Sequence, residues 1–109
     1  MKIVSFNINS IRARPHQIEH LRDTIDPDVI GLQETKVNDP DFPLEIINDI
    51  GYHVEFWGQK GHYGVAILSK CKPLSTVKGF ENDTEEDQKR FIQSNFKFGD
   101  EELIVMNGY

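Results

Sequence analysis

Gly31-Leu32-Gln33-Glu34-Thr35-Lys36 follows directly on the apolar pair Val29-Ile30 and brings a carboxylate and a lysine to the end of that run. Such a run is typical of a buried β-strand that ends at the rim of a sheet. In α/β sheets, ligands gather beyond the carboxyl ends of the strands. We therefore expect Glu34 to lie where a metal ion or a phosphate is bound. The alternative is a surface ion pair between Glu34 and Lys36.

An earlier strand ends in a similar way. Residues 2–8 alternate in side-chain character, which predicts a strand that ends near Asn7. A helix should follow, capped by Asn9 or Ser10, with Pro15 in its first turn and Asp26-Pro27 at its end. A strand over 28–33 completes a strand–helix–strand unit, which predicts parallel pairing with a right-handed crossover. Asn7 should then lie near Glu34.

The rest of the chain predicts one more helix and five more strands. The helix covers 43–50 and stops at Gly51. Strands are expected over 52–57, 64–69, 72–80, 90–98 and 103–106. The runs 29–32 and 103–106 are apolar on both faces and need cover on both sides, whereas two helices cover only one face and would leave the other bare.

We therefore expect an α/β fold with a mixed, mostly β sheet and two helices on one face. The missing cover predicts that residues 1–109 are the N-terminal part of a longer domain. A small complete α/β domain that dimerises through the bare face is the alternative.

Composition narrows the class of protein. The 109 residues are 38% hydrophobic and 28% charged, which fits one globular domain at most. An apolar run long enough for a membrane helix is absent from the sequence, and the first residues turn polar too soon for a secretory signal. Cys71 is the only cysteine, which excludes an internal disulfide and fits a reducing cytoplasm.

The charge is unevenly distributed. The net charge of −6 argues at first against a nucleic-acid partner. Basic residues nevertheless gather in the first 22 residues and again between Lys60 and Lys78, whereas acidic residues gather in 81–87 and 100–102. A basic face is compatible with this pattern, and so are solvated loops of either sign.

Oxygen and nitrogen donors near the expected strand ends are the candidate site residues. Mg²⁺ commonly takes one or two carboxylates, with water and substrate oxygens as its other ligands, so Glu34 suits such a site. The amide of Asn7 offers an oxygen to a hard cation or an NH₂ to a phosphate, or it closes a turn. Tyr109, at the end of the last strand, is placed to donate a hydrogen bond to a phosphate oxygen, or it belongs to an aromatic cluster at the rim.

Two other segments have the chemistry of a phosphate-binding surface. The glycine-rich stretch 58–66 contains Lys60, His62 and Tyr63 and suits a nucleic-acid backbone, although a plain hairpin loop would also explain it. Arg12 and Arg14 open the expected first helix, where its dipole disfavours cations. A bound phosphate would relieve that misfit.

Four motifs, taken together, resemble the bacterial exonuclease III/AP endonuclease family, in order and register over the whole chain. They are residues 4–14, 27–36, 58–66 and 107–109. Leu32-Gln33-Glu34-Thr35-Lys36 and Gly61-His62-Tyr63-Gly64-Val65-Ala66 distinguish this branch from DNase I-like nucleases and inositol-phosphate phosphatases. Ser10 stands where close relatives often have glycine.

The resemblance implies the N-terminal half of a four-layer, DNase I-like α/β sandwich. It implies a monomeric, cytoplasmic DNA-repair nuclease that depends on Mg²⁺, with Mn²⁺ as a substitute. Its substrates would be double-stranded DNA, attacked as a 3′→5′ exonuclease, and DNA with abasic sites, cut as an AP endonuclease.

The resemblance also implies roles for single residues. Glu34 and Asn7 would bind the metal. Asn7 and Tyr109 would be catalytic, Asn7 as an active-site amide and Tyr109 through contact with the scissile phosphate. DNA would be bound by a further set of side chains: Arg12, Lys60, His62, Tyr63 and Arg90. Lys36 matches the motif without a clear role.

The family's remaining Asp, Asn and His residues fall beyond residue 109, so the chain alone should be inactive. The alternatives are another phosphodiesterase or phosphatase of the superfamily, and a non-catalytic DNA-binding fragment.

Overall fold

The computed structural model describes residues 1–84 and 86–109, so Glu85 of the acidic run 81–87 lies outside the described residues. The elements follow one another as β1 (Ile3–Asn7), α1 (Pro15–Thr24), β2 (Val29–Gln33), a 3₁₀ helix (Asp39–Asp41), α2 (Leu44–Ile50), β3 (His53–Trp57), β4 (Val65–Ser69), β5 (Ser75–Lys78), β6 (Phe91–Phe98) and β7 (Glu101–Gly108). Among the described residues, no helix has the length and apolar character that crossing a membrane requires.

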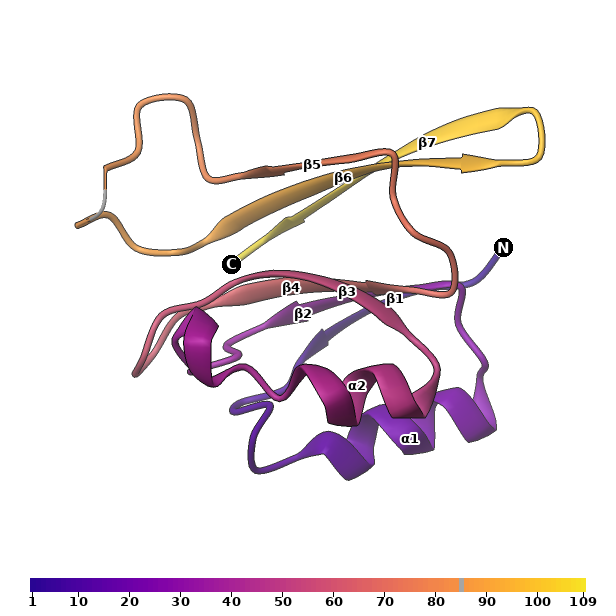
Figure 1. The fold of residues 1–109 in the computed structure, drawn as a ribbon, viewed down its shortest axis with the longest axis horizontal. Coiled ribbons are helices and arrows are strands. Elements are labelled where there is room, and N and C mark those ends of the chain that lie inside the picture. The colour runs from indigo at the N-terminus through magenta and orange to yellow at the C-terminus, as the bar shows by residue number, and fades with distance from the viewer. Residues whose placement is uncertain (85) are drawn as a thin grey trace.

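The strands form two sheets that pack face to face (Figure 1). The first has the order β1-β2-β4-β3, in which β1 and β2 pair in parallel, as the sequence predicts, and the other neighbours are antiparallel. The second sheet, β5-β6-β7, is antiparallel throughout. Helices α1 and α2 cover the free face of the first sheet, so the expectation of two helices on one face is confirmed.

The expectation that the other face of the first sheet would be bare is wrong. The strands from β5 onward form a sheet of their own, and that sheet covers this face. β2 and β4 are buried along their whole length because each contributes to both cores. One core lies between helices and sheet and includes Ile18, Ile30, Leu32, Ile47 and Leu68. The other lies between the sheets and consists of Val29, Val65, Ile67, Ile92 and Phe96.

The double-sided cover predicted for 103–106 is not present in this chain. Leu103 and Val105 pack against the core between the sheets, but Ile104 is 55% exposed and Met106 66% exposed. The outer face of the second sheet is therefore the uncovered one. The strand ends also differ from expectation, because β5 is shorter than predicted and β7 is longer.

The start of α1 corrects another prediction. The helix begins at Pro15 with Arg14 as its N-cap, and no side chain caps it. Asn9 and Ser10 have φ angles of 49° and 87°, so neither opens a helix. The backbone N–H of Ser10 donates to the carbonyl of Glu34 (2.9 Å), which keeps this segment alongside the end of β2. Arg12 therefore precedes the helix, and the argument from its dipole does not apply to that residue.

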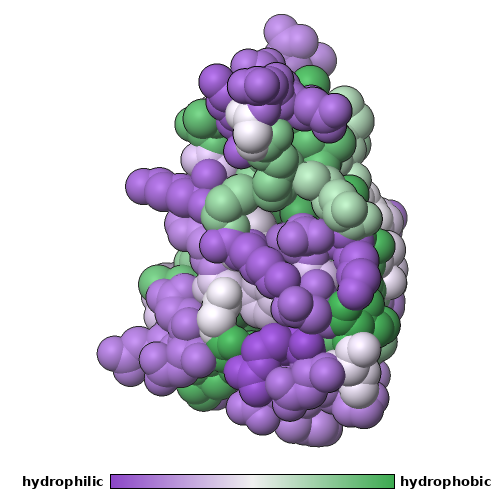
Figure 2. Space-filling view, turned by 90° about the vertical axis from the view of Figure 1, so that its right-hand side faces the viewer, coloured by the Kyte–Doolittle hydropathy of each residue, from purple (hydrophilic) through white to green (hydrophobic). Residues whose placement is uncertain are grey.

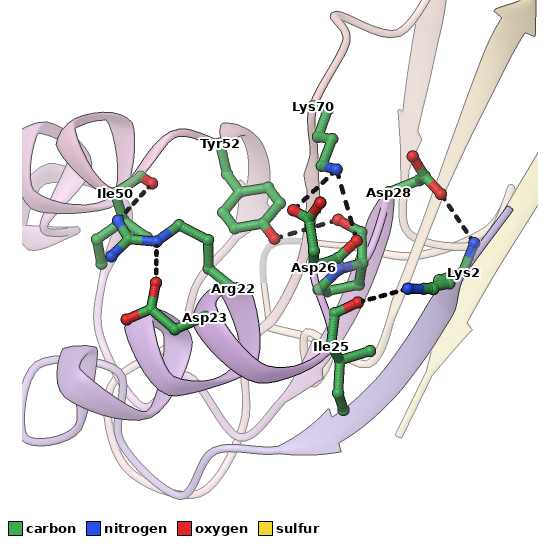
Figure 3. A network of polar contacts seen from close by, with 10 residues as sticks. Lys2, Arg22, Asp23, Ile25, Asp26, Asp28, Ile50, Tyr52 and Lys70 are labelled. Carbon is green, nitrogen blue, oxygen red and sulfur yellow. Dashed lines mark hydrogen bonds and ion pairs between the residues drawn. The ribbon is translucent and has the colours of Figure 1, made fainter.

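Polar contacts fix the connection between α1 and β2 (Figure 3). Lys70 Nζ lies 2.9 Å from Asp26 Oδ1, and the hydroxyl of Tyr52 donates to the carbonyl of Pro27 (3.1 Å). Lys2 Nζ donates to the carbonyl of Ile25 (3.0 Å). The ion pair with Asp26 raises the pKa of Lys70. These contacts tie the connection to the start of β1, the start of β3 and the end of β4.

This network lies at the end of the first sheet where β1 and β2 begin. Lys2 and Lys70 therefore belong to the end opposite to Glu34, and the basic residues do not gather on one face. Figure 2 shows the molecule from the side of its N-terminus, where hydrophilic residues cover most of the surface and apolar ones form separate patches.

Candidate active site

Glu34 lies immediately after β2, in a segment with an unusual backbone. Glu34 and Lys36 have φ angles of 56° and 58°, in the left-handed region that side chains rarely adopt. The segment is held because Thr35 N–H donates to the carbonyl of Gly64 (3.1 Å) and Lys36 N–H to that of Tyr63 (2.9 Å). A Cβ on Gly64 would lie 2.1 Å from Thr35 Oγ1, so this close approach requires glycine.

The carboxylate of Glu34 accepts hydrogen bonds from residues that arrive on different strands. Oε1 accepts from Asn7 Nδ2 (3.1 Å) at the end of β1 and from the hydroxyl of Tyr109 (2.6 Å) directly after β7. Oε2 lies 3.3 Å from Lys36 Nζ. The first sheet thus supplies Glu34 and Asn7, and the second supplies Tyr109. The structure brings the three predicted residues together around one carboxylate.

These donors determine the protonation of the site. The hydrogen bond from Tyr109, the hydrogen bond from Asn7 and the contact with Lys36 lower the pKa of Glu34 to about 2. The same hydrogen bond raises the pKa of Tyr109, because the carboxylate stabilises the protonated hydroxyl. At neutral pH, Glu34 is therefore ionised and Tyr109 keeps its proton.

Lys36 has a structural role that its sequence motif did not reveal. Its Nζ donates to Asn9 Oδ1 (2.6 Å) while it also contacts Glu34. The backbone N–H of Asn9 in turn donates to Asn7 Oδ1 (3.1 Å), and the backbone carbonyl of Asn9 accepts a hydrogen bond from the guanidinium of Arg14. Lys36 therefore links the Glu34 carboxylate to the turn after β1 and places a compensating charge beside it.

The donor set at Glu34 fits a hard divalent cation. Within residues 1–84 and 86–109, no three His, Cys, Asp or Glu side chains lie together in a group able to hold a metal ion. Mg²⁺ often binds to only one or two carboxylates, however, and takes water and substrate oxygens as its other ligands. The ionised, partly exposed carboxylate of Glu34 is suitable as such a ligand. Asn7 turns its NH₂ toward Glu34 and its oxygen toward Asn9 N–H, so a metal-ligand role for Asn7 stays a prediction.

Arg90 and Tyr63 lie next to Tyr109, which donates to this carboxylate. The Cζ of Arg90 lies 5.0 Å from the ring centre of Tyr63 and 5.5 Å from that of Tyr109, within the range of cation–π contacts. Tyr109 N–H donates to the carbonyl of Arg90 (2.9 Å), and Arg90 Nη1 donates to the carbonyl of Tyr109 (3.1 Å). Arg90 is thereby fixed beside the group that binds Glu34, which its sequence position did not indicate clearly.

The remaining predicted DNA-binding residues are His62, Lys60 and Arg12, which lie in loops. The ring of His62 packs edge-on against Tyr63, with the ring centres 6.4 Å apart. Lys60 is anchored through its backbone N–H, which donates to Asn38 Oδ1 (2.9 Å), and its side chain is exposed. Arg12 is exposed in the turn between β1 and α1. Their contacts with DNA stay predictions.

A buried amide pair beneath the site was missed by the sequence analysis. Asn107 is 6% exposed, and its Nδ2 donates to the carbonyls of Leu32 and Ala66, both at 2.8 Å. Its Oδ1 accepts from Gln33 Nε2 (2.7 Å). Asn107 on β7 is thus bonded to both central strands of the other sheet. The polar side chain of Gln33, at the end of an otherwise apolar strand, was the feature of the sequence that could have indicated a buried hydrogen bond here.

Comparison with known proteins places this arrangement in a family. Residues 4–106 match the Endonuclease/Exonuclease/phosphatase family. The chain is 53% identical over 109 residues to exodeoxyribonuclease III of Haemophilus influenzae, which covers all of the chain and 41% of that relative. It is 33% identical to an exodeoxyribonuclease of Bacillus subtilis, covering 42% of that protein. The chain thus spans about two fifths of the length of these relatives.

Solved structures agree with this result. An AP endonuclease from Archaeoglobus fulgidus superposes with a TM-score of 0.86 at 38% identity, over all of the chain and 40% of the other protein. A 3′ phosphatase from Neisseria, bound to a product DNA hairpin, gives a TM-score of 0.87 at 32% identity, with 41% of its chain covered. The expected DNase I-like α/β fold is therefore confirmed for the part that this chain represents. The chain belongs to the endonuclease/exonuclease/phosphatase family.

Proposed function

We propose that this chain is the N-terminal part of a Mg²⁺-dependent DNA-repair nuclease, with Mn²⁺ as a substitute metal. Its substrates would be phosphodiesters of double-stranded DNA, attacked from the 3′ end or at abasic sites. The observation that supports this most directly is the convergence of Asn7 and Tyr109 on one oxygen of Glu34. The relatives named exodeoxyribonuclease and AP endonuclease support the substrate class.

The residues of this chain would act by binding and orienting. A Mg²⁺ ion held by Glu34 would supply charge stabilisation at a phosphoryl oxygen. Asn7 and Tyr109 fix the rotation of the Glu34 carboxylate. Arg90 holds its positive charge over the ring of Tyr109, where it would attract a phosphate. The hydroxyl of Tyr109 donates its single proton to Glu34, so a hydrogen bond from it to the phosphate would require that the bond to Glu34 is given up.

We expect no cleavage by residues 1–109 alone. Among residues 1–84 and 86–109, the side chains bonded to Glu34 are Asn7, Lys36 and Tyr109, and each of them donates to the carboxylate. A group that accepts a proton from the attacking water at neutral pH is therefore not among them. Purified chain, incubated with Mg²⁺ and abasic duplex DNA, should give only background cleavage. Robust turnover would refute this expectation.

A chimera tests the positive part of the proposal. Residues 1–109 would be joined to the remaining part of the Haemophilus relative, which is 53% identical over the shared segment. The chimera should cut abasic duplex DNA with Mg²⁺, and Glu34→Gln should reduce kcat by orders of magnitude. Glu45→Gln, on the exposed surface of α2, is the matched control. A near-normal rate for Glu34→Gln would exclude the metal role of Glu34.

A second candidate activity is removal of a 3′ phosphate from DNA. The superposition with a 3′ phosphatase from Neisseria favours it. In the same chimera, phosphate release from a 3′-phosphorylated strand would be compared with incision at an internal abasic site. DNA binding that is sensitive to salt but indifferent to Mg²⁺ and Glu34 would instead favour a non-catalytic binding fragment.

A further inference from the structure

An exposed aromatic ring stands between two hollows on the surface beside Arg90. Phe80 is 59% exposed, although one face of its ring stacks on Phe91 with ring centres 4.5 Å apart and planes 18° apart. One hollow, of about 550 Å³, has Trp57, Lys78, Lys89 and Phe80 in its lining. The other, of about 360 Å³, is lined by Phe80 and Arg90 together with the carboxylates of Asp83, Glu86 and Asp87. We call these two hollows and the ring between them the Phe80 groove.

The groove is a built feature rather than a loose loop. A Cβ on Gly79 would lie 2.4 Å from the ring of Trp57, so glycine allows the backbone before Phe80 to rest on the indole. Phe80 N–H donates to Asp83 Oδ2 (2.8 Å), which closes the turn after it. Lys89 Nζ lies 4.5 Å from the ring centre of Trp57. Aromatic faces and positive charge thus lie close together at a fixed place.

The groove is continuous with the candidate active site. Gly64 N–H donates to the carbonyl of Lys89 (3.1 Å), and Gly64 also packs on Thr35, next to Glu34. Arg90 lines the second hollow and also lies over the ring of Tyr109. A strand that leaves the site past Arg90 would therefore reach Phe80 directly.

We propose that the Phe80 groove binds an unpaired nucleotide of a DNA strand adjacent to the candidate active site. Aromatic rings next to positive charges are the surface on which single-stranded bases stack. Carboxylates line both hollows and disfavour phosphates in either of them: Glu81, Asp83, Glu86 and Asp87. A base therefore enters the groove, and the sugar–phosphate backbone stays outside it. This inference rests on the proposed function, because it assumes a DNA substrate.

The chain contains its own reporter for this test. Trp57 is the only tryptophan, so intrinsic fluorescence reports on the groove. Oligothymidylate of about ten nucleotides and a blunt DNA duplex would each be titrated into the full chain. The oligothymidylate should quench Trp57, whereas the blunt duplex should leave the signal nearly unchanged.

Variants separate stacking from mere exposure. Phe80→Leu keeps apolar bulk without a ring and should weaken oligothymidylate binding by about fivefold to a hundredfold, the usual range for loss of one stacked base. Leu74→Ala removes an apolar side chain of similar exposure (63%) that does not line the groove, and it should have no effect.

Several outcomes would overturn the proposal. The first is that oligothymidylate does not quench Trp57. The second is that Phe80→Leu weakens the binding of duplex and of single-stranded DNA equally. The third is that the Trp57 fluorescence changes with the protein concentration and not with the oligonucleotide concentration, which would indicate that a second copy of the chain occupies the groove. Glu34→Gln should leave this binding intact. An inactive chimera with a functional groove would therefore contradict the proposed catalysis and not the groove.

Discussion

Asn107 offers the sharpest test of how the two sheets are joined. Asn107→Ala would remove both donors from the carbonyls of Leu32 and Ala66, in residues that are fully buried. Leu32 and Ala66 face each other in the β2–β4 ladder, so the variant loses two hydrogen bonds from the amide, each with a net value of about 0.5–1.5 kcal/mol. Gln33 Nε2, which also loses Asn107 as a partner, still donates to Ser5 Oγ (3.2 Å). The loss of stability is therefore assigned to the two hydrogen bonds between Asn107 and the carbonyls. We expect the free energy of unfolding to fall by about 1–3 kcal/mol.

The assay is urea denaturation of the full chain, followed by Trp57 fluorescence. The midpoint should shift with little change in the denaturant slope, as for a change in stability alone. Asn48→Ala, at an exposed position on α2, is the control and should stay within about 0.5 kcal/mol of the wild type. Asn107→Asp replaces the donors by acceptors and should be at least as damaging at neutral pH. A loss below about 1 kcal/mol for Asn107→Ala would refute the reasoning.

Two further predictions concern the segment around Glu34. Tyr109→Phe should raise the pKa of Glu34 from about 2 toward 4.5, because the hydroxyl is the strongest cause of the depression. A carboxyl group whose pKa is lowered in the folded state stabilises the fold at pH values above its unfolded-state pKa, and this stabilisation is lost as the pH falls toward 2. Between these pH values, the variant should therefore lose less stability than the wild type. Carboxylate NMR titration and acid unfolding measure both effects, and an unchanged titration would contradict the role of Tyr109. Gly64→Ala should destabilise the chain more than Gly61→Ala in thermal melts. Both residues have positive φ, at 104° and 99°, but only at Gly64 would the new Cβ meet Thr35 Oγ1. Equal losses would show that the contact with Thr35 is unimportant.

Local pattern was sufficient for most of the fold. The alternation in 2–8, the apolar run 29–32 and the alternation in 90–98 each predict a strand that the structure contains. Gly51 ends α2 with a φ of 118°, as a helix-terminating glycine should. The segments that failed are those where tertiary contacts decide the backbone. Asn9 and Ser10 resemble helix caps in sequence, yet they continue alongside β2 because Ser10 bonds to Glu34.

The φ of 87° at Ser10 lies in the region that glycine adopts most readily, so a glycine would be accommodated at this position without strain. How the later strands divide between two sheets was not predictable from periodicity, because the same alternation serves a strand in either sheet. Asn7, Glu34 and Tyr109 were candidates because they lie at the ends of predicted strands, and the resemblance gave each of them a role. Gln33 and Asn107 lie within the motifs 27–36 and 107–109, but nothing in the sequence indicated their buried hydrogen bonds.

The hydrogen bond between Tyr109 and Glu34 has a consequence for the order of folding. Its partners are 75 residues apart in the chain, and Gln33 and Asn107 are 74 apart. Contacts at such separation form only after the large entropy of loop closure has been overcome, whereas the hairpin of β6 and β7 is local. During synthesis, the emerging chain holds Glu34 long before Tyr109 exists. We therefore expect the carboxylate to acquire its low pKa and fixed orientation only after the second sheet has docked on the first.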